Sequence, residues 1–140
     1  MAEAYLLVTA GRRLVGLPVS QLEGVAEPGA VMPVPTSEPA LRGVGAVRGT
    51  TLPIVCLRTL LGEPGAVGAP AEVMVIVAAG GVRLGLEVDA ADIVLRGEPM
   101  PAPGDGSMPW ARAVMRHEGA LVPLLDLGAL GARMTETGRA

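Results

Sequence analysis

The single histidine and the single cysteine are the residues best suited to chemistry in this chain. His117 stands in the polar segment RHEG, and Cys56 lies inside the apolar run LPIVCL. A nucleophilic thiolate needs an activating base beside it, and a zinc ion needs several convergent ligands. Because the two residues lie far apart in the sequence, we expect a solvated turn histidine and a small strand-face cysteine. The sequence therefore predicts a non-enzymatic protein with no catalytic, cofactor-binding or metal-binding residues.

The carboxylates offer a second possibility. Asp89 and Asp92 follow the apolar run GLEV, and a pair of carboxylates can carry out acid–base catalysis. Aspartate serves more often as a turn or capping residue, so we favour that role here. The segment 104–106 (GDG) lacks the preceding strand and following helix of a phosphate-binding loop.

Arg48 is the most prominent polar residue on an otherwise apolar stretch, because it separates two apolar segments within Val47-Arg48-Gly49. Arginine is enriched at the energetic centres of protein interfaces. A solvated turn arginine has the same appearance in a sequence. From the residues alone, both interpretations stay open.

Composition excludes several classes of partner. The net charge is −3, and one tyrosine and one tryptophan are the only aromatic residues. Nucleic-acid binding usually needs a basic surface or aromatic stacking platforms. The first residues have no basic lead ahead of a long apolar run, and no apolar run is as long as a membrane span. We expect a cytoplasmic protein with no nucleic-acid partner and no direct membrane insertion.

The apolar residues form short runs separated by glycine and proline, which is typical of strands in an all-β sandwich or barrel. With 13 prolines and 20 glycines, long helices are disfavoured. Short helical turns are predicted at 58–61 and 127–130. The predicted strands are 5–10, 14–17, 44–47, 52–57, 73–79, 82–88 and 120–125.

An internal repeat organises these elements. Residues 49–62 read GTTLPIVCLRTLLG and residues 119–131 read GALVPLLDLGALG, so that glycine, proline and leucine recur at an offset of 70. Gly16, Val19 and Val25 recur as Gly85, Val88 and Val94 at an offset of 69. We predict a single domain over 1–140, with one lobe at about 1–62, a connector at 62–71, a second lobe at about 72–131 and a short polar tail at 132–140. Two lobes side by side leave a groove for a partner.

The segments 40–49 (ALRGVGAVRG) and 52–58 (LPIVCLR) together resemble the signature of CheW-like domains. The segments 5–8 (YLLV), 15–19 (VGLPV), 85–89 (GLEVD) and 124–127 (LLDL) are similar to further family motifs, in order along nearly the whole chain. The resemblance implies a fold of two small intertwined five-stranded β barrels.

The resemblance also implies a function. CheW-like proteins are adaptors that couple the cytoplasmic tip of a chemoreceptor to the regulatory domain of a histidine autokinase, and some contact other CheW-like proteins. The implied partner-binding residues are Leu22, Val25, Gly43, Val47, Arg48 and Gly49. A diverged accessory protein that binds only one partner and does not activate the kinase is the alternative. A small β-barrel enzyme or ligand carrier is a third possibility, but the sequence offers no catalytic set for it.

Three positions depart from the family pattern. Gly24 stands where the family has a glutamate, and the nearest acid, Glu23, is displaced by one residue. Ala46 replaces an asparagine, and Cys56 replaces an aspartate. These departures put kinase activation in question without affecting the expected fold.

Overall fold

The computed structural model describes residues 3–27, 29–63, 71, 73–106 and 110–137; of 79, 92 and 135–137 only the backbone is described. Two successive sets of elements fill these ranges. The first set is β1 (Glu3–Ala10), β2 (Arg13–Pro18), the 3-10 turn η1 (Val19–Gln21), β3 (Leu22–Ala26), β4 (Val31–Met32), β5 (Leu41–Val47), β6 (Thr50–Cys56) and α1 (Leu57–Leu60). The second set is β7 (Val73–Ala79), β8 (Val82–Val88), β9 (Ala90–Gly97), β10 (Met100–Pro101), β11 (Ala111–His117), β12 (Ala120–Leu125) and α2 (Leu127–Thr137).

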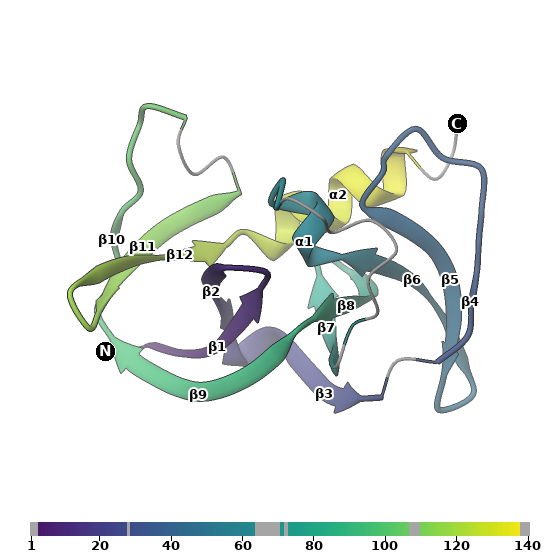
Figure 1. The fold of residues 1–140 in the computed structure, drawn as a ribbon, viewed down its shortest axis with the longest axis horizontal. Coiled ribbons are helices and arrows are strands. Elements are labelled where there is room, and N and C mark those ends of the chain that lie inside the picture. The colour runs from purple at the N-terminus through teal and green to yellow at the C-terminus, as the bar shows by residue number, and fades with distance from the viewer. Residues whose placement is uncertain (1–2, 28, 64–70, 72, 107–109, 138–140) are drawn as a thin grey trace.

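The strands form two sheets, and each sheet draws on both repeats (Figure 1). The first sheet has the order β10-β11-β12-β2-β1-β9, and the second has the order β3-β7-β8-β6-β5-β4. A hairpin from one repeat thus lies in a sheet with four strands of the other repeat and pairs directly with two of them. The two repeats consequently do not correspond one to one with the two sheets.

The all-β prediction is confirmed, but the expected closed barrels are replaced by sheets whose strand order has two ends. Each sheet contains five longer strands and one strand of two residues, β4 or β10, which adds a sixth position at one edge. The expected short helical content is also confirmed, with α1 of 4 residues and α2 of 11. None of the helices in the described part of the chain has the length and apolarity needed to cross a bilayer.

Glycine makes the parallel contacts between the repeats possible. In the first sheet β12 runs parallel to β2 with Leu124 opposite Gly16, and in the second β6 runs parallel to β8 with Ile54 opposite Gly85. A Cβ on Gly16 would lie 2.6 Å from Cδ2 of Leu124, and one on Gly85 would lie 2.8 Å from Cδ1 of Ile54. Glycine therefore recurs at these two equivalent positions of the repeat because a large side chain of the neighbouring strand packs closely on each.

The main core lies where the two sheets meet, between the β1–β2 hairpin of one and the β7–β8 hairpin of the other. Alternate residues of these hairpins face opposite ways, so that Val75 and Val77 enter the main core while Met74 and Ile76 enter a smaller one. A matching small cluster in the first sheet contains Tyr5, Met115 and Leu124. The aliphatic composition thus suffices to fill three clusters with only one buried aromatic ring.

Helix α2 extends further than the sequence predicted. We expected a helical turn ending at Leu130 and a polar tail from 132, but the helix continues through Thr137. Leu127, Leu130 and Met134 lie on one face of this helix and are buried in the main core. The methionine was overlooked because it stands among polar residues. The expected connector at 62–71 lies mostly outside the described residues.

Side chains fix the end of α2 against the first half of the chain. Arg133 on the helix donates from Nε to Oε2 of the buried Glu38 at 2.8 Å. The Arg133 guanidinium also lies over the Trp110 ring, with Cζ 5.0 Å from the ring centroid. Arg133 thus anchors this C-terminal helix through a charged hydrogen bond to a buried carboxylate and through a cation–π contact.

Candidate partner-docking site

Arg48 and Gly49 form the two-residue turn between β5 and β6, because Val47 pairs with Thr50. Both have positive φ, 51° at Arg48 and 80° at Gly49, as the tight turn of a hairpin requires. Positive φ is unusual for a residue with a long side chain. The equivalent turn of the second repeat has the same geometry, with φ 50° at Glu118 and 81° at Gly119. The backbone conformation is therefore a property of the repeat and does not by itself mark Arg48 as functional.

The guanidinium of Arg48 lies over Gly24 in β3. A Cβ on Gly24 would be 3.3 Å from Nη1 and 3.8 Å from Cζ of Arg48. Strands β3 and β5 are not neighbours in the second sheet, so the sheet curls until the hairpin turn approaches β3. The absence of a side chain at Gly24 leaves the room that this guanidinium occupies.

The displaced acid Glu23 is engaged elsewhere. Its Oε1 accepts a hydrogen bond from Nε of Arg83, at 2.5 Å, across the hairpin of the second repeat. Glu23 therefore does not substitute for the missing acid at position 24. Among the described residues, no carboxylate forms an ion pair with Arg48, which leaves its donors facing solvent.

The other predicted docking residues divide into surface and packing positions. Val25 lies on β3 and is 51% exposed, but it faces the side of the strand opposite to Gly24, because successive strand residues alternate. Leu22 and Val47 are half-buried, the first against the main core and the second against the smaller cluster of the second sheet. Of the predicted set, Arg48, Gly49 and Val25 are thus exposed, and only Arg48 and Gly49 share one element, the β5–β6 turn.

Gly43 has a different role from the one predicted. It is buried in β5 with φ 145°, and a Cβ there would lie 2.0 Å from the carbonyl oxygen of Met32. No partner can reach such a position without displacing β4. Gly43 therefore allows β4 to pack closely on β5.

An apolar hollow next to this surface was missed by the sequence reasoning. It has a volume of about 620 Å³ and is lined mainly by residues of β4 and β5, including Val31, Met32, Val44 and Ala46. Met32 is 69% exposed. It went unnoticed because it lies in a proline-rich segment with no strand-like run. The hollow continues to Thr51, which is next to the hairpin turn that carries Arg48.

The residues suited to chemistry are placed apart from one another. Cys56 is buried at the N-terminus of α1, and its side chain makes no capping hydrogen bond there. The equivalent residue of the second repeat, Asp126, caps α2 by accepting from the amide of Ala129 at 3.0 Å. His117 is half-buried at the end of β11, with Nε2 3.9 Å from Oε2 of Glu118. Within the described ranges, no three His, Cys, Asp or Glu side chains are grouped as metal ligands.

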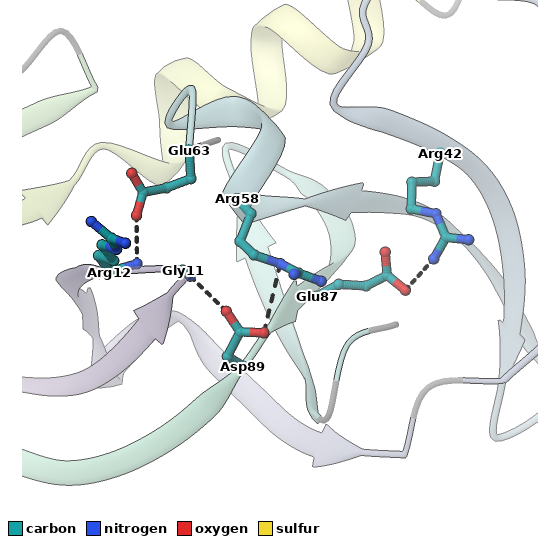
Figure 2. A network of polar contacts seen from close by, with 7 residues as sticks. All are labelled: Gly11, Arg12, Arg42, Arg58, Glu63, Glu87 and Asp89. Carbon is teal, nitrogen blue, oxygen red and sulfur yellow. Dashed lines mark hydrogen bonds and ion pairs between the residues drawn. The ribbon is translucent and has the colours of Figure 1, made fainter. Parts of the chain in front are cut away.

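Asp89 has the structural role that we favoured for it (Figure 2). Its Oδ2 accepts from the amide of Gly11 in the β1–β2 turn at 2.6 Å, and its Oδ1 lies 3.6 Å from Nε of Arg58. Glu63 supports the same turn, because its Oε1 accepts from the amide of Arg12 at 2.5 Å. The two carboxylates therefore hold the β1–β2 turn against α1. The side chain of Asp92 lies outside the described residues.

Comparisons with known proteins agree on one architecture. The chain matches the family model described as a CheW-like domain over residues 4–133. No curated protein sequence matches it. Among solved structures, the crystal structure of the scaffolding protein TtCheW from Thermoanaerobacter tengcongensis is similar, with a TM-score of 0.79 and 18% sequence identity over 89% of each chain. At this identity the likeness establishes the fold.

Proposed function

Because the chain belongs to the CheW-like domain family, as its match over residues 4–133 shows, we propose that it is an adaptor coupling a chemoreceptor to a histidine autokinase. The family consists of scaffolding proteins of chemotaxis signalling, so a non-enzymatic binding role is the common ground. The finer proposal is that one surface of this chain contacts the receptor tip or the regulatory domain of the kinase. We place that surface at Arg48 and Gly49, with the apolar hollow near their turn; Val25 stays a predicted contact on the other face of β3.

The position of Arg48 is the observation that supports this surface. Its guanidinium lies over Gly24 of β3, and its donors are not paired with an acid of the described chain. Arginine presents five donors in a planar fork that fits a carboxylate or a pair of carbonyl groups. The hollow lined by Met32 and Val44, which reaches Thr51 near the hairpin turn, supplies apolar contact area. A charged fork next to apolar surface is the usual composition of an interface centre.

The test is to substitute Arg48→Ala and to measure melting and affinity on the same samples. Truncation of an interface anchor costs roughly 2 kcal/mol of binding, or about thirtyfold in affinity. The fold should lose little, because an exposed arginine without an ion pair contributes within about 0.5 kcal/mol. Arg48→Lys should recover only part of the affinity, because lysine keeps the charge but lacks the fork. Unchanged capture of both receptor and kinase by Arg48→Ala would exclude this residue from the interface.

The control must be an arginine that makes no structural contact. Arg83 is unsuitable, because it pairs with Glu23. Arg116 on β11 is exposed, and its side chain forms no ion pair or side-chain hydrogen bond that is found among the described residues. Arg116→Ala should therefore leave both melting and affinity unchanged.

A second candidate function is favoured by the glycine at position 24. A chain in which no acid fixes the orientation of Arg48 presents a more mobile guanidinium, which suits an accessory protein that binds one partner without activating the kinase. Separate binding measurements with the cognate receptor and the cognate kinase distinguish the two functions. Binding to both, with kinase activation in a reconstituted mixture, supports the coupling role, and binding to one alone supports the accessory role.

A further inference from the structure

Each repeat places an arginine at an equivalent β-bulge. In β5 the register shifts between Leu41 and Gly43, so that Arg42 is the extra residue of a β-bulge. In β11 the register shifts between Ala111 and Ala113, so that Arg112 is the extra residue there. The offset of 70 is the one that relates the rest of the repeat. Bulges redirect side chains, so both arginines are aimed in the same way relative to their own sheet.

In the second sheet this arginine has a partner within the chain (Figure 2). Nη1 of Arg42 lies 2.5 Å from Oε2 of Glu87, whose side chain is only 4% exposed. Glu87 comes from the neighbouring repeat, on β8, where it is opposite Met74 of β7. A carboxylate of the other repeat therefore fills the position that the bulge arginine faces.

In the first sheet the corresponding position has no carboxylate. Glu87 corresponds by the offset of 69 to Pro18, which is opposite Tyr5 just as Glu87 is opposite Met74. Pro18 and Arg112 instead line an open hollow of about 480 Å³, together with Glu3, Ser20, Gln21 and Arg96. The structure thus contains an occupied and an unoccupied version of the same arginine site.

The electrostatics of the hollow favour an anion. Arg96 lines the hollow as a second base beside Arg112. Glu3 is the acid of the lining, and it accepts a hydrogen bond from the Tyr5 hydroxyl. In the described part of the chain, neither Arg96 nor Arg112 forms an ion pair with an acid. Two guanidinium groups therefore face the hollow against one carboxylate that is already engaged.

We infer that the hollow between β2, β9 and β11 binds a carboxylate group, which takes the place that Glu87 fills in the other repeat. Arg112 supplies the charged donor, Arg96 adds a second, and Ser20 and Gln21 supply neutral polar groups. The inference rests on the proposed function only for the origin of the carboxylate, which in an adaptor is an acidic side chain of a partner protein. This pocket belongs to the first sheet, whereas Arg48 and Val25 belong to the second.

The test follows the arginine Nε–Hε signals of the labelled protein by NMR while a ligand is added. The ligands are the peptide acetyl-Ala-Glu-Ala-amide, its glutamine counterpart and free glutarate. Saturable shifts at Arg96 and Arg112 are expected with the glutamate peptide and not with the glutamine peptide. Arg112→Gln should weaken binding at least tenfold, while Arg116→Gln on the same strand should leave it unchanged. Saturation by glutarate alone assigns the pocket to a free dicarboxylate instead of a partner side chain.

An internal ligand gives a second, independent test. Pro18→Glu introduces a carboxylate at the position equivalent to Glu87, and it should shift the Arg112 signal and abolish the response to the peptide. Equal responses to both peptides, an equally strong response at Arg116, or an Arg112 signal unmoved by a folded Pro18→Glu variant would each overturn the inference. If that variant does not fold, the Arg112→Gln comparison decides alone. None of these measurements involves a receptor or a kinase, so they stand even if the proposed coupling role fails.

Discussion

Restoring an acid beneath Arg48 is the perturbation whose size the structure defines best. Gly24 lies in β3 and is not among the glycines with positive φ, so a side chain there meets no backbone penalty. The nearest obstacle is the tip of Arg48, 3.3 Å from an added Cβ, which is flexible and exposed. Gly24→Glu should therefore fold and place its carboxylate within ion-pair distance of the guanidinium.

Two contributions add in this variant. Glycine inside a strand costs roughly 0.5–1 kcal/mol relative to alanine, and Gly24→Ala alone should recover part of that. An exposed ion pair adds about 0.2–1 kcal/mol. Gly24→Glu should thus raise the free energy of unfolding by roughly 1 kcal/mol, or about 4 °C in Tm for a chain of this size.

The assay is a double-mutant cycle in urea that combines Gly24→Glu and Gly24→Gln with Arg48→Gln. The coupling free energy should be about 0.5 kcal/mol and should shrink in 1 M salt, because exposed charges are screened. A coupling of zero would refute the assigned contact between positions 24 and 48. A loss of stability in Gly24→Ala would refute the conclusion that β3 accepts a side chain at this position.

Three further predictions follow from contacts described above. Gly43→Ala forces a Cβ against a backbone carbonyl at a positive φ. It should lower the free energy of unfolding in urea by roughly 3 kcal/mol or more, up to loss of the fold, and an unchanged urea midpoint would contradict this. Asp89→Ala removes the charged acceptor of the Gly11 amide and should lower the free energy of unfolding by about 2 kcal/mol. A loss within about 0.5 kcal/mol would show that the β1–β2 turn does not depend on this hydrogen bond. Burial, the hydrogen bond to Glu3 and the charge of Glu3 raise the pKa of Tyr5 to about 12, so the ultraviolet titration of this single tyrosine should have its midpoint near there, and Glu3→Gln should lower it. Since the folded pKa lies above the unfolded one, the corresponding stability is present below pH 10 and lost as the pH rises to about 12; a midpoint at 10 in folded protein would contradict the burial of the hydroxyl.

The sequence predicted seven of the twelve strands of the described residues, because those seven are short apolar runs bounded by glycine and proline. It missed β3, β4, β9, β10 and β11, whose apolar residues are too few or are mixed with charged ones. The repeat also predicted equivalent turns, which the matching φ angles of Arg48 and Glu118 display. It did not predict which repeat supplies the strands of each sheet, because an offset between similar segments carries no information about pairing. The length of α2 was missed because only one residue of its last turns, Met134, is apolar and buried.

For the candidate site, the residue pattern drew attention to Arg48 without deciding its role, and it did not reveal its neighbour Gly24. Its contact with Gly24 depends on the curl of a sheet in which β3 and β5 are separated by other strands. Gly43 was named among the partner-binding residues because the family resemblance implied it, and a glycine in a signature can mark either close packing or an exposed turn. The structure resolves this ambiguity in favour of packing beneath β4. Met32 and the hollow beside it could not be found, since proline-rich segments give no periodic signal.

The exchange of hairpins between the repeats has a consequence for folding and for ancestry. Since β1–β2 pairs with β9 and β12, and β7–β8 pairs with β3 and β6, every pairing that joins the two repeats in the described sheets links residues distant in the chain. Such a topology folds slowly, because large loops must close before the pairings form. A single repeat has no partner for its own hairpin unless a second copy supplies one. A one-repeat ancestor of this fold would accordingly have been an obligate, strand-exchanged dimer, and duplication within one gene would have made that association permanent.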